Sequence, residues 1–174
     1  MPEEKLSIPV GDEDYSQGSK DAKTTLVEYG DYECSYCGQA YSIIKKVQKE
    51  LGDDLRFVFR NFPLTQVHPN ALHAAEAAEI AGAQGNFWEM HDALYKNQKS
   101  LDDESLKNYA AEIGLDAEKF AKDLDGDTFE EKVRTDFMNG VESGVNGTPS
   151  FFINGVRFDE SWEYESLLEA LKNA

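Results

Sequence analysis

Both cysteines of this 174-residue chain lie in the stretch GDYECSYCGQAY, at Cys34 and Cys37. Two thiols three residues apart can form a structural disulfide, half of a metal site, or a pair that exchanges electrons. The last of these needs one thiol that ionises readily and a second that stays protonated until a mixed disulfide has formed. The element that carries the pair decides whether the two thiols can differ in this way.

The pair is placed at the start of a predicted helix. TTLVEYGD predicts a buried strand bounded by Gly30, and from Cys34 to Leu51 apolar residues recur at helical spacing until Gly52 ends the pattern. Unpaired N–H groups and the helix dipole stabilise a thiolate there, so Cys34 should ionise more readily than a free cysteine of pKa about 8.5. Cys37 lies one turn further on, on the apolar stripe, and should be shielded. We expect an exposed nucleophile with a resolving thiol behind it.

The remaining pattern predicts a sheet interrupted by helices. LRFVFRNFP reads as a strand that completes a β-α-β unit, and SFFINGVRF as a hairpin with Asn154-Gly155 at its turn. Between them, residues 65 to 145 have helical spacing throughout. The expected helix starts are His68-Pro69 and the capping boxes Asn86-x-x-Glu89 and Asp127-x-x-Glu130.

The two ends of the chain are less regular. The first twenty or so residues are polar, with LSIPV as an edge strand or an arm, and WEYESLLEALKN predicts a closing amphipathic helix. MPEEKLSIPVGDED has neither the basic nor the apolar region of an export signal, which favours a cytoplasmic location. A periplasmic chain from which a signal had been removed would look the same.

Composition excludes several classes. With 40% hydrophobic residues the chain can bury one substantial core, so it does not need the many disulfides of a small secreted scaffold. Its 34 acidic and 17 basic residues give a net charge of −17. Nucleic acids and anionic membranes both require clustered cations, so we expect neither as a partner. We interpret the charge as a solvated acidic surface.

The chain resembles the DsbA family of thiol–disulfide oxidoreductases over roughly residues 14 to 172. The resemblance rests on VEYGDYECSYC, FRNFPL, HPNALHAAEAA, FWEMHDAL and VNGTPSFFING, in that order. It implies an α/β, thioredoxin-like fold with an α-helical insertion. The thioredoxin-like domain would comprise residues 1–64 and 146–174, and the inserted helical domain residues 65–145.

The resemblance also implies roles for three residues of the reaction centre. Cys34 is the attacking thiolate and Cys37 the resolving thiol. Glu28, six residues before Cys34, matches a buried acid that assists proton transfer. On the residues alone the burial of Glu28 is open, because the strand is apolar at Leu26 and Val27 and a solvent-facing side chain is equally consistent with it.

The resemblance also implies that four further residues take part in substrate binding. Thr148-Pro149 matches the cis-proline loop that faces the dithiol and docks substrate, and Ser35-Tyr36 is the dipeptide that tunes the thiolate. Ser35 replaces a frequent proline, and Tyr36 replaces the histidine of the most oxidising members. The dipeptide thus offers a hydroxyl and a phenol but no cation.

Partners and cofactors follow from this interpretation. The redox-active Cys34–Cys37 pair needs no other cofactor, and the expected partners are proteins with thiols or disulfides and an unidentified redox recycling partner. A zinc site needs about four ligands, two of which would have to come from His68, His73 and His91, so we expect no metal and treat the histidines as cap or packing residues.

Two alternatives for the function stay open. One is a glutathione-linked reductase or transferase on the same fold, and the other is a binding or holdase module whose dithiol is incidental.

The loop residues Asp31 and Glu33 are predicted to be solvated. Because they lie so near Cys34, their negative charges are also predicted to oppose its ionisation.

Overall fold

Five strands form one mixed sheet in the order β1-β3-β2-β4-β5, in a computed structural model that describes residues 3–174. Met1 and Pro2, with which the stretch MPEEKLSIPVGDED begins, lie outside the described residues. The strands are β1 (Tyr15–Gln17), β2 (Thr24–Gly30), β3 (Leu55–Asn61), β4 (Ser150–Ile153) and β5 (Val156–Phe158). The helices are α1 (Ser35–Leu51), the 3-10 turn η1 (Gly52–Asp54), α2 (Ala71–Ala83), α3 (Phe87–Lys96), α4 (Asp103–Glu112), α5 (Ala117–Asp125), α6 (Glu130–Glu142) and α7 (Tyr164–Lys172).

The predicted β-α-β unit and hairpin are both present. Strands β2 and β3 are parallel and are connected through α1, whereas β4 pairs antiparallel with β2 and with β5. Helix α1 ends where Gly52 takes a φ of 51°. Asn154 and Gly155 have φ values of 50° and 83°, as a two-residue hairpin turn of the primed type requires.

Alternation along β2 divides its side chains between two apolar layers. Leu26 lies in the layer shared with α1 and α3, whereas Val27 and Tyr29 lie in a smaller layer on the opposite face. Glu28 pairs in register with Phe59 and Phe151, which belong to the α1 layer. A buried carboxyl group is therefore placed on the sheet face that also holds the two cysteines.

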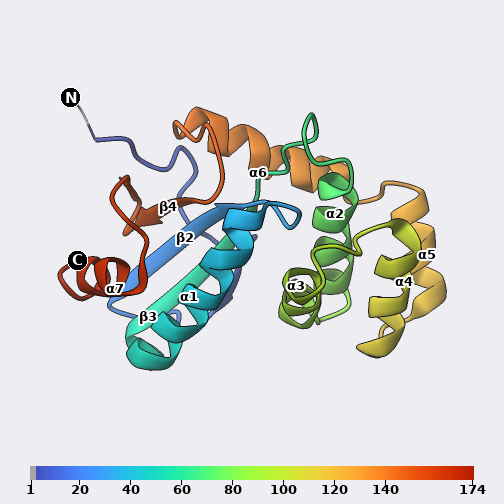
Figure 1. The fold of residues 1–174 in the computed structure, drawn as a ribbon, viewed down its shortest axis with the longest axis horizontal. Helices are drawn as coiled ribbons and strands as arrows, with labels where there is room; N and C mark the ends of the chain where they lie inside the picture. Colours follow the sequence, from blue (N-terminus) through green and yellow to red (C-terminus); the bar gives the residue numbers. More distant parts are fainter. Residues whose placement is uncertain (1–2) are drawn as a thin grey trace.

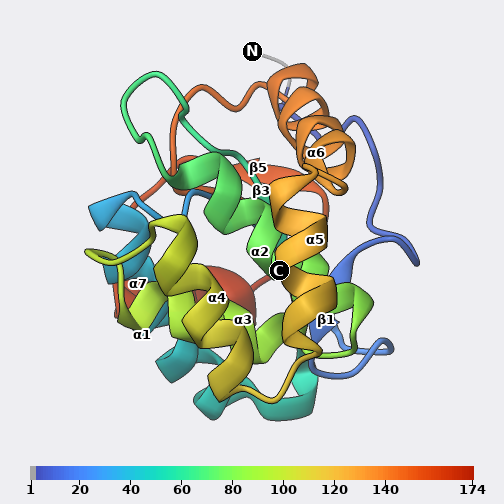
Figure 2. The same cartoon turned by 90° about the vertical axis from the view of Figure 1, so that its right-hand side faces the viewer.

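Helices α2 to α6 are all inserted between β3 and β4. In Figure 1, α2, α3, α4 and α5 lie to the right of the sheet, and α6 runs back across the top toward β4. Figure 2 shows α4 and α5 as the outer helices of this group, with α2 behind them. This agrees with an α-helical insertion in a thioredoxin-like fold, while the domain limits at residues 64/65 and 145/146 stay a prediction.

A buried polar network attaches the helical group to the end of β3. The Asn61 backbone N–H and side-chain amide both donate to Asp136 of α6, and the amide also donates to Glu79 of α2. The Lys132 ammonium group lies 3.0 Å from Asp136 and 3.5 Å from Glu79. Because these buried carboxylates are paired with donors, the network fixes α2 and α6 relative to the sheet.

The predicted starts of α2 and α6 are wrong, whereas the predicted start of α3 at Asn86 is confirmed. Helix α2 begins at Ala71, with Asn70 as its N-cap, because His68 belongs to a preceding turn in which its backbone N–H donates to the Leu64 carbonyl. Asn86 is the N-cap of α3 but its side chain makes no capping bond. Asp127 takes a φ of 50° in the turn after α5, so α6 starts three residues later with Phe129 as N-cap.

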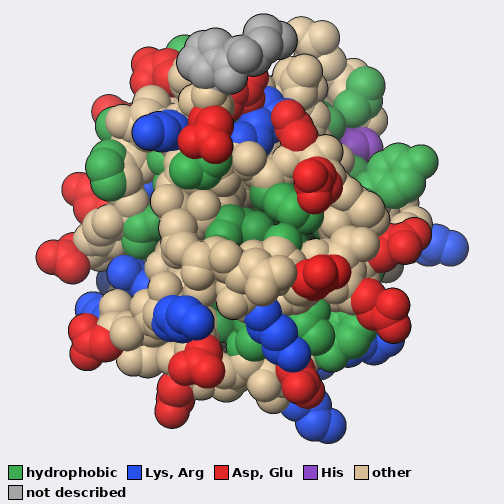
Figure 3. Space-filling model, turned by 90° about the vertical axis from the view of Figure 1, so that its left-hand side faces the viewer, with side chains coloured by type: hydrophobic (Ala, Val, Ile, Leu, Met, Phe, Trp, Pro, Cys, Tyr) green, Lys and Arg blue, Asp and Glu red, His purple; other side chains and the backbone are tan. Residues whose placement is uncertain are grey.

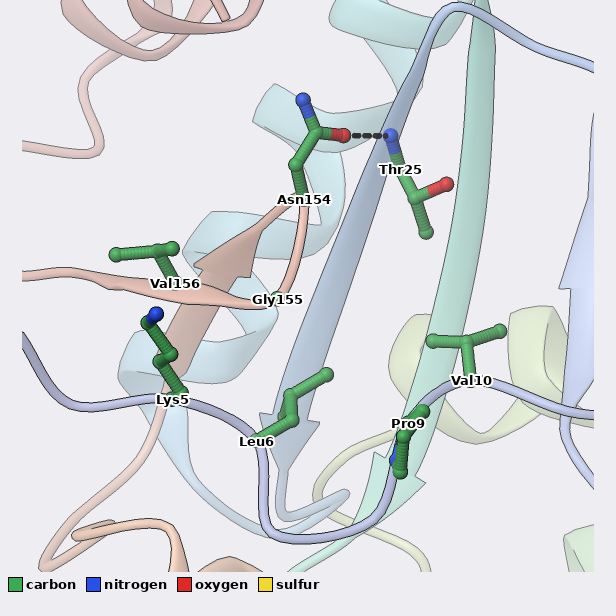
Figure 4. Close-up of a pocket in the computed structure, with 8 residues that line it drawn as sticks. All are labelled: Lys5, Leu6, Pro9, Val10, Thr25, Asn154, Gly155 and Val156. Atoms are coloured by element: carbon green, nitrogen blue, oxygen red, sulfur yellow. Dashed lines mark hydrogen bonds between the residues drawn. The ribbon is translucent and has the colours of Figure 1, made fainter.

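The N-terminal segment is an arm along β5. LSIPV forms no strand, and the first strand instead lies at Tyr15–Gln17. Leu6 donates its backbone N–H to the Gly155 carbonyl, and a pocket of about 410 Å³ lies between this arm and the hairpin (Figure 4). Neither cysteine lines that pocket.

One face of the molecule carries side chains of both charges. On the face seen in Figure 3, acidic side chains are dispersed among basic and neutral ones and form no single large patch.

Within residues 3–174, no helix has the length and apolar character needed to cross a bilayer.

Candidate active site

Cys34 is the N-cap of α1, and Cys37 lies in the first turn of the same helix. The Cys34 backbone is extended, with φ −77° and ψ 124°, and the N–H of Gly38 donates to its carbonyl. The two thiols are not joined in a disulfide. The structure therefore confirms the predicted placement of the pair at a helix N-terminus.

Cys34 is less exposed than the sequence predicts. Its relative accessibility is only 6%, against 0% for Cys37. The Thr148 carbonyl lies 3.8 Å from the Cys34 Sγ, and the Gln98 amide donates to the carbonyls of Cys34 and Tyr32. Thr148, which is distant in sequence, thus lies against the thiol, whereas Ser35 and Tyr36, which follow it, are exposed.

The two thiols differ strongly in acidity. The pKa of Cys34 is lowered to about 5, chiefly by a hydrogen bond from Cys37, which outweighs the opposing effect of burial. The backbone N–H groups of Cys37 and Tyr36 contribute further lowering. Burial raises the pKa of Cys37 well above its usual value, and its hydrogen bond to Cys34 adds to the effect. One thiol is a thiolate at neutral pH and its neighbour is its proton-bearing donor.

Glu28 is a buried acid beneath this pair. It is 1% exposed, and its Oε2 has no hydrogen-bond partner among the described residues. A Cβ at residue 30 would lie 2.8 Å from that oxygen and 2.5 Å from the Phe59 ring, so the space beside the carboxyl group requires Gly30. Burial, followed by the negative charge of Cys34, raises the pKa of Glu28 to about 8. The open question of its burial is decided by the fold.

The Thr148–Pro149 peptide bond is cis, as predicted, and lies directly before β4. Thr148 and Pro149 are half-buried, and the Thr148 hydroxyl has no partner among the described residues. On the other side of Cys34, Ser35 and Tyr36 are exposed, with Tyr36 at 61%. Their binding roles stay a prediction, and the structure brings all four residues to the rim around Cys34.

The predicted solvation of Asp31 is wrong. Asp31 is 1% exposed, and its carboxylate accepts bonds from the Glu33 and Leu64 backbone N–H groups and lies 2.7 Å from His68 Nδ1. Glu33 in turn accepts from the backbone and side chain of Asn70. Both carboxylates are hydrogen-bonded to residues of the loop after β3, and these bonds hold the active-site loop against it.

His68 is the residue that sequence reasoning missed. Burial favours its neutral form, but the hydrogen bond to Asp31 and the charges of Asp31 and Cys34 raise its pKa overall. A cation can therefore form near Cys34, although the Ser35-Tyr36 dipeptide supplies none. No spacing rule could find it, because His68 lies 37 residues from its partner Asp31.

A second missed contact comes from the helical insertion. Gln98 lies between α3 and α4, and its side-chain amide packs closely against Gly38, the residue after the second cysteine. His91 of α3 is buried, with its Nδ1 2.8 Å from the Tyr32 hydroxyl. The insertion thus packs against the active-site loop from one side.

Comparison with known proteins identifies the family. Residues 11–173 match the family model Thioredoxin_4, described as thioredoxin, and the chain belongs to that family. BdbD from Bacillus subtilis superposes with a TM-score of 0.87 at 25% identity, over 98% of this chain and 96% of that one. A thioredoxin-like oxidoreductase from Silicibacter pomeroyi gives 0.82 at 25% identity, over 94% and 92%.

A more distant match supports the fold alone. The thiol-disulfide exchange protein α-DsbA2 from Wolbachia pipientis gives a TM-score of 0.80 at 21% identity, over 92% of this chain and 87% of that one. The chain therefore belongs to the thioredoxin family, and its fold matches that of solved structures named as DsbA-type thiol–disulfide exchange proteins.

Relatives identified by sequence carry a different name. A Na(+)/H(+) antiporter NhaA 1 from Salinispora arenicola is 42% identical over 170 residues, which cover 97% of this chain and 26% of that protein. A Na(+)/H(+) antiporter NhaA from Herminiimonas arsenicoxydans is 41% identical over 168 residues, covering 96% and 27%. The chain spans about a quarter of the length of these curated relatives.

Proposed function

We propose that this chain exchanges dithiols and disulfides with protein or small-thiol substrates, with Cys34 as nucleophile and Cys37 as resolving thiol. The observation that carries the proposal is the difference between two adjacent thiols. Cys34 caps a helix and has a pKa of about 5, whereas Cys37 is fully buried and has a raised pKa. Exchange through a mixed disulfide requires this difference.

In the reducing direction the Cys34 thiolate attacks a substrate disulfide, forms a mixed disulfide and releases one substrate thiolate. Cys37 then loses its proton and attacks the Cys34 Sγ, which forms the Cys34–Cys37 disulfide and releases the second substrate thiolate. Two electrons pass to the substrate, and its two thiolates take up two protons. The reverse sequence oxidises a substrate dithiol.

Glu28 is proposed as the acceptor of the Cys37 proton. Formation of the mixed disulfide removes the negative charge of Cys34, which is one of the two causes of the raised pKa of Glu28. The ionised carboxylate is thereby favoured at the step that needs a proton acceptor. Glu28 would act on the second step and not on the first.

Substrate binding is proposed at the rim around Cys34. The Thr148 carbonyl lies beside the nucleophile, and the exposed Tyr36 ring offers an apolar contact. An extended substrate segment could pair its backbone with the residue before Pro149. The proposed partners are proteins with thiols or disulfides and a separate redox partner that recycles the pair. No metal or further cofactor is required for this exchange.

Trapping a mixed disulfide tests the proposal. The Cys37→Ala variant should accumulate covalent complexes with a disulfide-containing substrate through Cys34, because the resolving thiol is gone. Non-reducing electrophoresis and mass spectrometry would identify the linked cysteine. The matched Cys34→Ala variant should form none, and adducts found mainly on Cys37 in the wild-type protein would reverse the assigned roles.

Two further assays distinguish this function from a glutathione-linked enzyme and from a holdase. Turnover with glutathione but little with a protein disulfide would favour the glutathione-linked enzyme. A Cys34→Ser, Cys37→Ser variant that keeps full activity in an aggregation assay would favour the holdase.

We expect a reduction potential between that of DsbA, about −120 mV, and that of thioredoxin, about −270 mV. DsbA is a strong oxidant because its nucleophile, of pKa about 3.5, is stabilised in the reduced form. The Cys34 pKa of about 5 indicates weaker stabilisation here. Equilibration against glutathione redox buffers measures the potential directly, and a value as high as that of DsbA would contradict the expectation.

The location sets the direction of net exchange. In a reducing cytoplasm, where we propose that the chain acts, such a potential would keep the pair mainly as the dithiol and favour reduction or isomerisation. In a periplasm the same chain would act as a modest oxidant. The antiporter activity in the names of the longer relatives is not assigned to this chain, because the chain matches only about a quarter of the length of each relative.

A further inference from the structure

A cluster of His73, Glu76 and Asp127 lies in the helical insertion, formed by elements other than those that hold Cys34 and Cys37. His73 and Glu76 are one turn apart on α2, and Asp127 lies in the turn between α5 and α6. One ligand atom from each residue lies within 4.8 Å of the other two. Two segments of the insertion therefore bring nitrogen and oxygen donors to one point.

Glu76 is the unusual member of the cluster. Its side chain is fully buried, and neither carboxyl oxygen has a hydrogen-bond partner among the described residues. Its nearest charged contact is His73, with Nε2 at 3.8 Å from Oε2. A buried carboxyl group normally has a partner.

The imidazole of His73 is already oriented for a metal. Its Nδ1 lies 2.6 Å from Asp103 Oδ1, while its Nε2 faces Asp127 Oδ1 at 2.9 Å. Metal-binding histidines usually donate their second ring N–H to a carboxylate in this manner, which fixes the ring and raises its basicity. Asp103 would hold the ring, and an ion would take the place of the proton between His73 Nε2 and Asp127 Oδ1.

The spacing suits a small divalent ion. In a tetrahedral site with bonds of about 2.0–2.1 Å, neighbouring ligand atoms are about 3.3 Å apart. The His73 Nε2 distances of 2.9 Å to Asp127 and 3.8 Å to Glu76 lie on either side of that value. The His73 and Asp127 side chains are 30% and 45% exposed, so an ion can enter and water can occupy a fourth position.

We propose that His73, Glu76 and Asp127 bind Zn²⁺, with Asp103 as a positioning residue behind His73. An imidazole with two carboxylates favours zinc over Mg²⁺ and Ca²⁺, which prefer oxygen ligands alone. The ion would join α2 to the α5–α6 turn and, through Asp103, to the start of α4. This site is independent of the exchange proposed for the cysteines, and it differs from the expectation from the sequence that the chain binds no metal.

Calorimetric titration of Zn²⁺ into untagged Cys34→Ser, Cys37→Ser protein tests the site, because the dithiol could itself bind zinc. We expect one equivalent to bind in the micromolar range and to raise the melting temperature, with Mg²⁺ and Ca²⁺ at least about 100-fold weaker. Co²⁺ in place of zinc should give the visible absorption of a four-coordinate site.

Single substitutions in that background identify the ligands. Glu76→Gln and Asp127→Asn should each weaken binding by more than about 100-fold, and Asp103→Asn by about 10- to 100-fold. Asparagine tolerates the positive φ of residue 127, so this variant keeps the turn. Asp125→Asn removes an equal charge two residues away and should leave the affinity unchanged. Absent binding, equal affinity for Ca²⁺, or unchanged affinity in both ligand variants would overturn the proposal.

Discussion

Cys34 should be alkylated at pH 5 at about half of its own high-pH plateau rate, because its pKa of about 5 leaves half of it as thiolate. A free cysteine of pKa about 8.5 would reach only about 0.03% of its plateau at that pH. Referring each rate to its own plateau removes differences in access and in intrinsic nucleophilicity. The reduced protein treated with iodoacetamide between pH 4 and pH 9 gives the profile, and peptide mapping locates the adduct.

Variants of Cys37 test the cause of this acidity. Cys37→Ala removes the hydrogen bond that lowers the pKa of Cys34 most, so the inflection of the profile should move to higher pH. Cys37→Ser keeps a hydrogen-bond donor and should move it less. Cys37 itself, fully buried and with a raised pKa, should react only after unfolding. An inflection near pH 8 in the wild-type protein would show that the helix N-terminus and Cys37 do not stabilise the thiolate.

Glu28→Gln should stabilise the reduced protein by about 3 kcal/mol at pH 7 and by almost nothing at pH 4. Burial raises the pKa of Glu28 to about 8 in the folded state, from 4.5 in the unfolded state. Above pH 4.5 the unfolded chain releases a proton that the folded chain keeps, so stability falls as pH rises toward 8. Each pH unit in that window costs about 1.4 kcal/mol, and glutamine has no proton to lose.

Denaturant unfolding at several pH values measures this difference. The exposed Glu50→Gln variant is the matched control and should change stability by less than about 0.5 kcal/mol at every pH. If Glu28 also relays the Cys37 proton, Glu28→Gln should slow resolution of a mixed disulfide more than the first attack by Cys34. An equal stability change at pH 4 and pH 8 would exclude the raised pKa, and unchanged rates in both steps would exclude the relay.

The sequence alone predicted the elements whose signals are local. The apolar stripe from Cys37 to Leu51, the stop at Gly52 and the Asn154-Gly155 turn each depend on residues a few positions apart. The resemblance of ordered motifs added the thioredoxin-like fold and the cis peptide before Pro149. Starts of α2 and α6 were wrong because His68 and Asp127 have local cap signals but make contacts with distant segments.

Tertiary structure alone decided the electrostatics of the site. Glu28 lies in a strand whose sequence is compatible with either face of the sheet, and the β2 register with Phe59 and Phe151 places it inside. Asp31 and His68 meet across 37 residues, and Thr148 and Cys34 across 114. Burial and pairing between such distant positions set the pKa values of the site. These contacts leave no periodic pattern in the sequence from which they could be predicted. The sequence therefore determined which residues could react, and the packing of strands, loops and inserted helices decided their protonation and access.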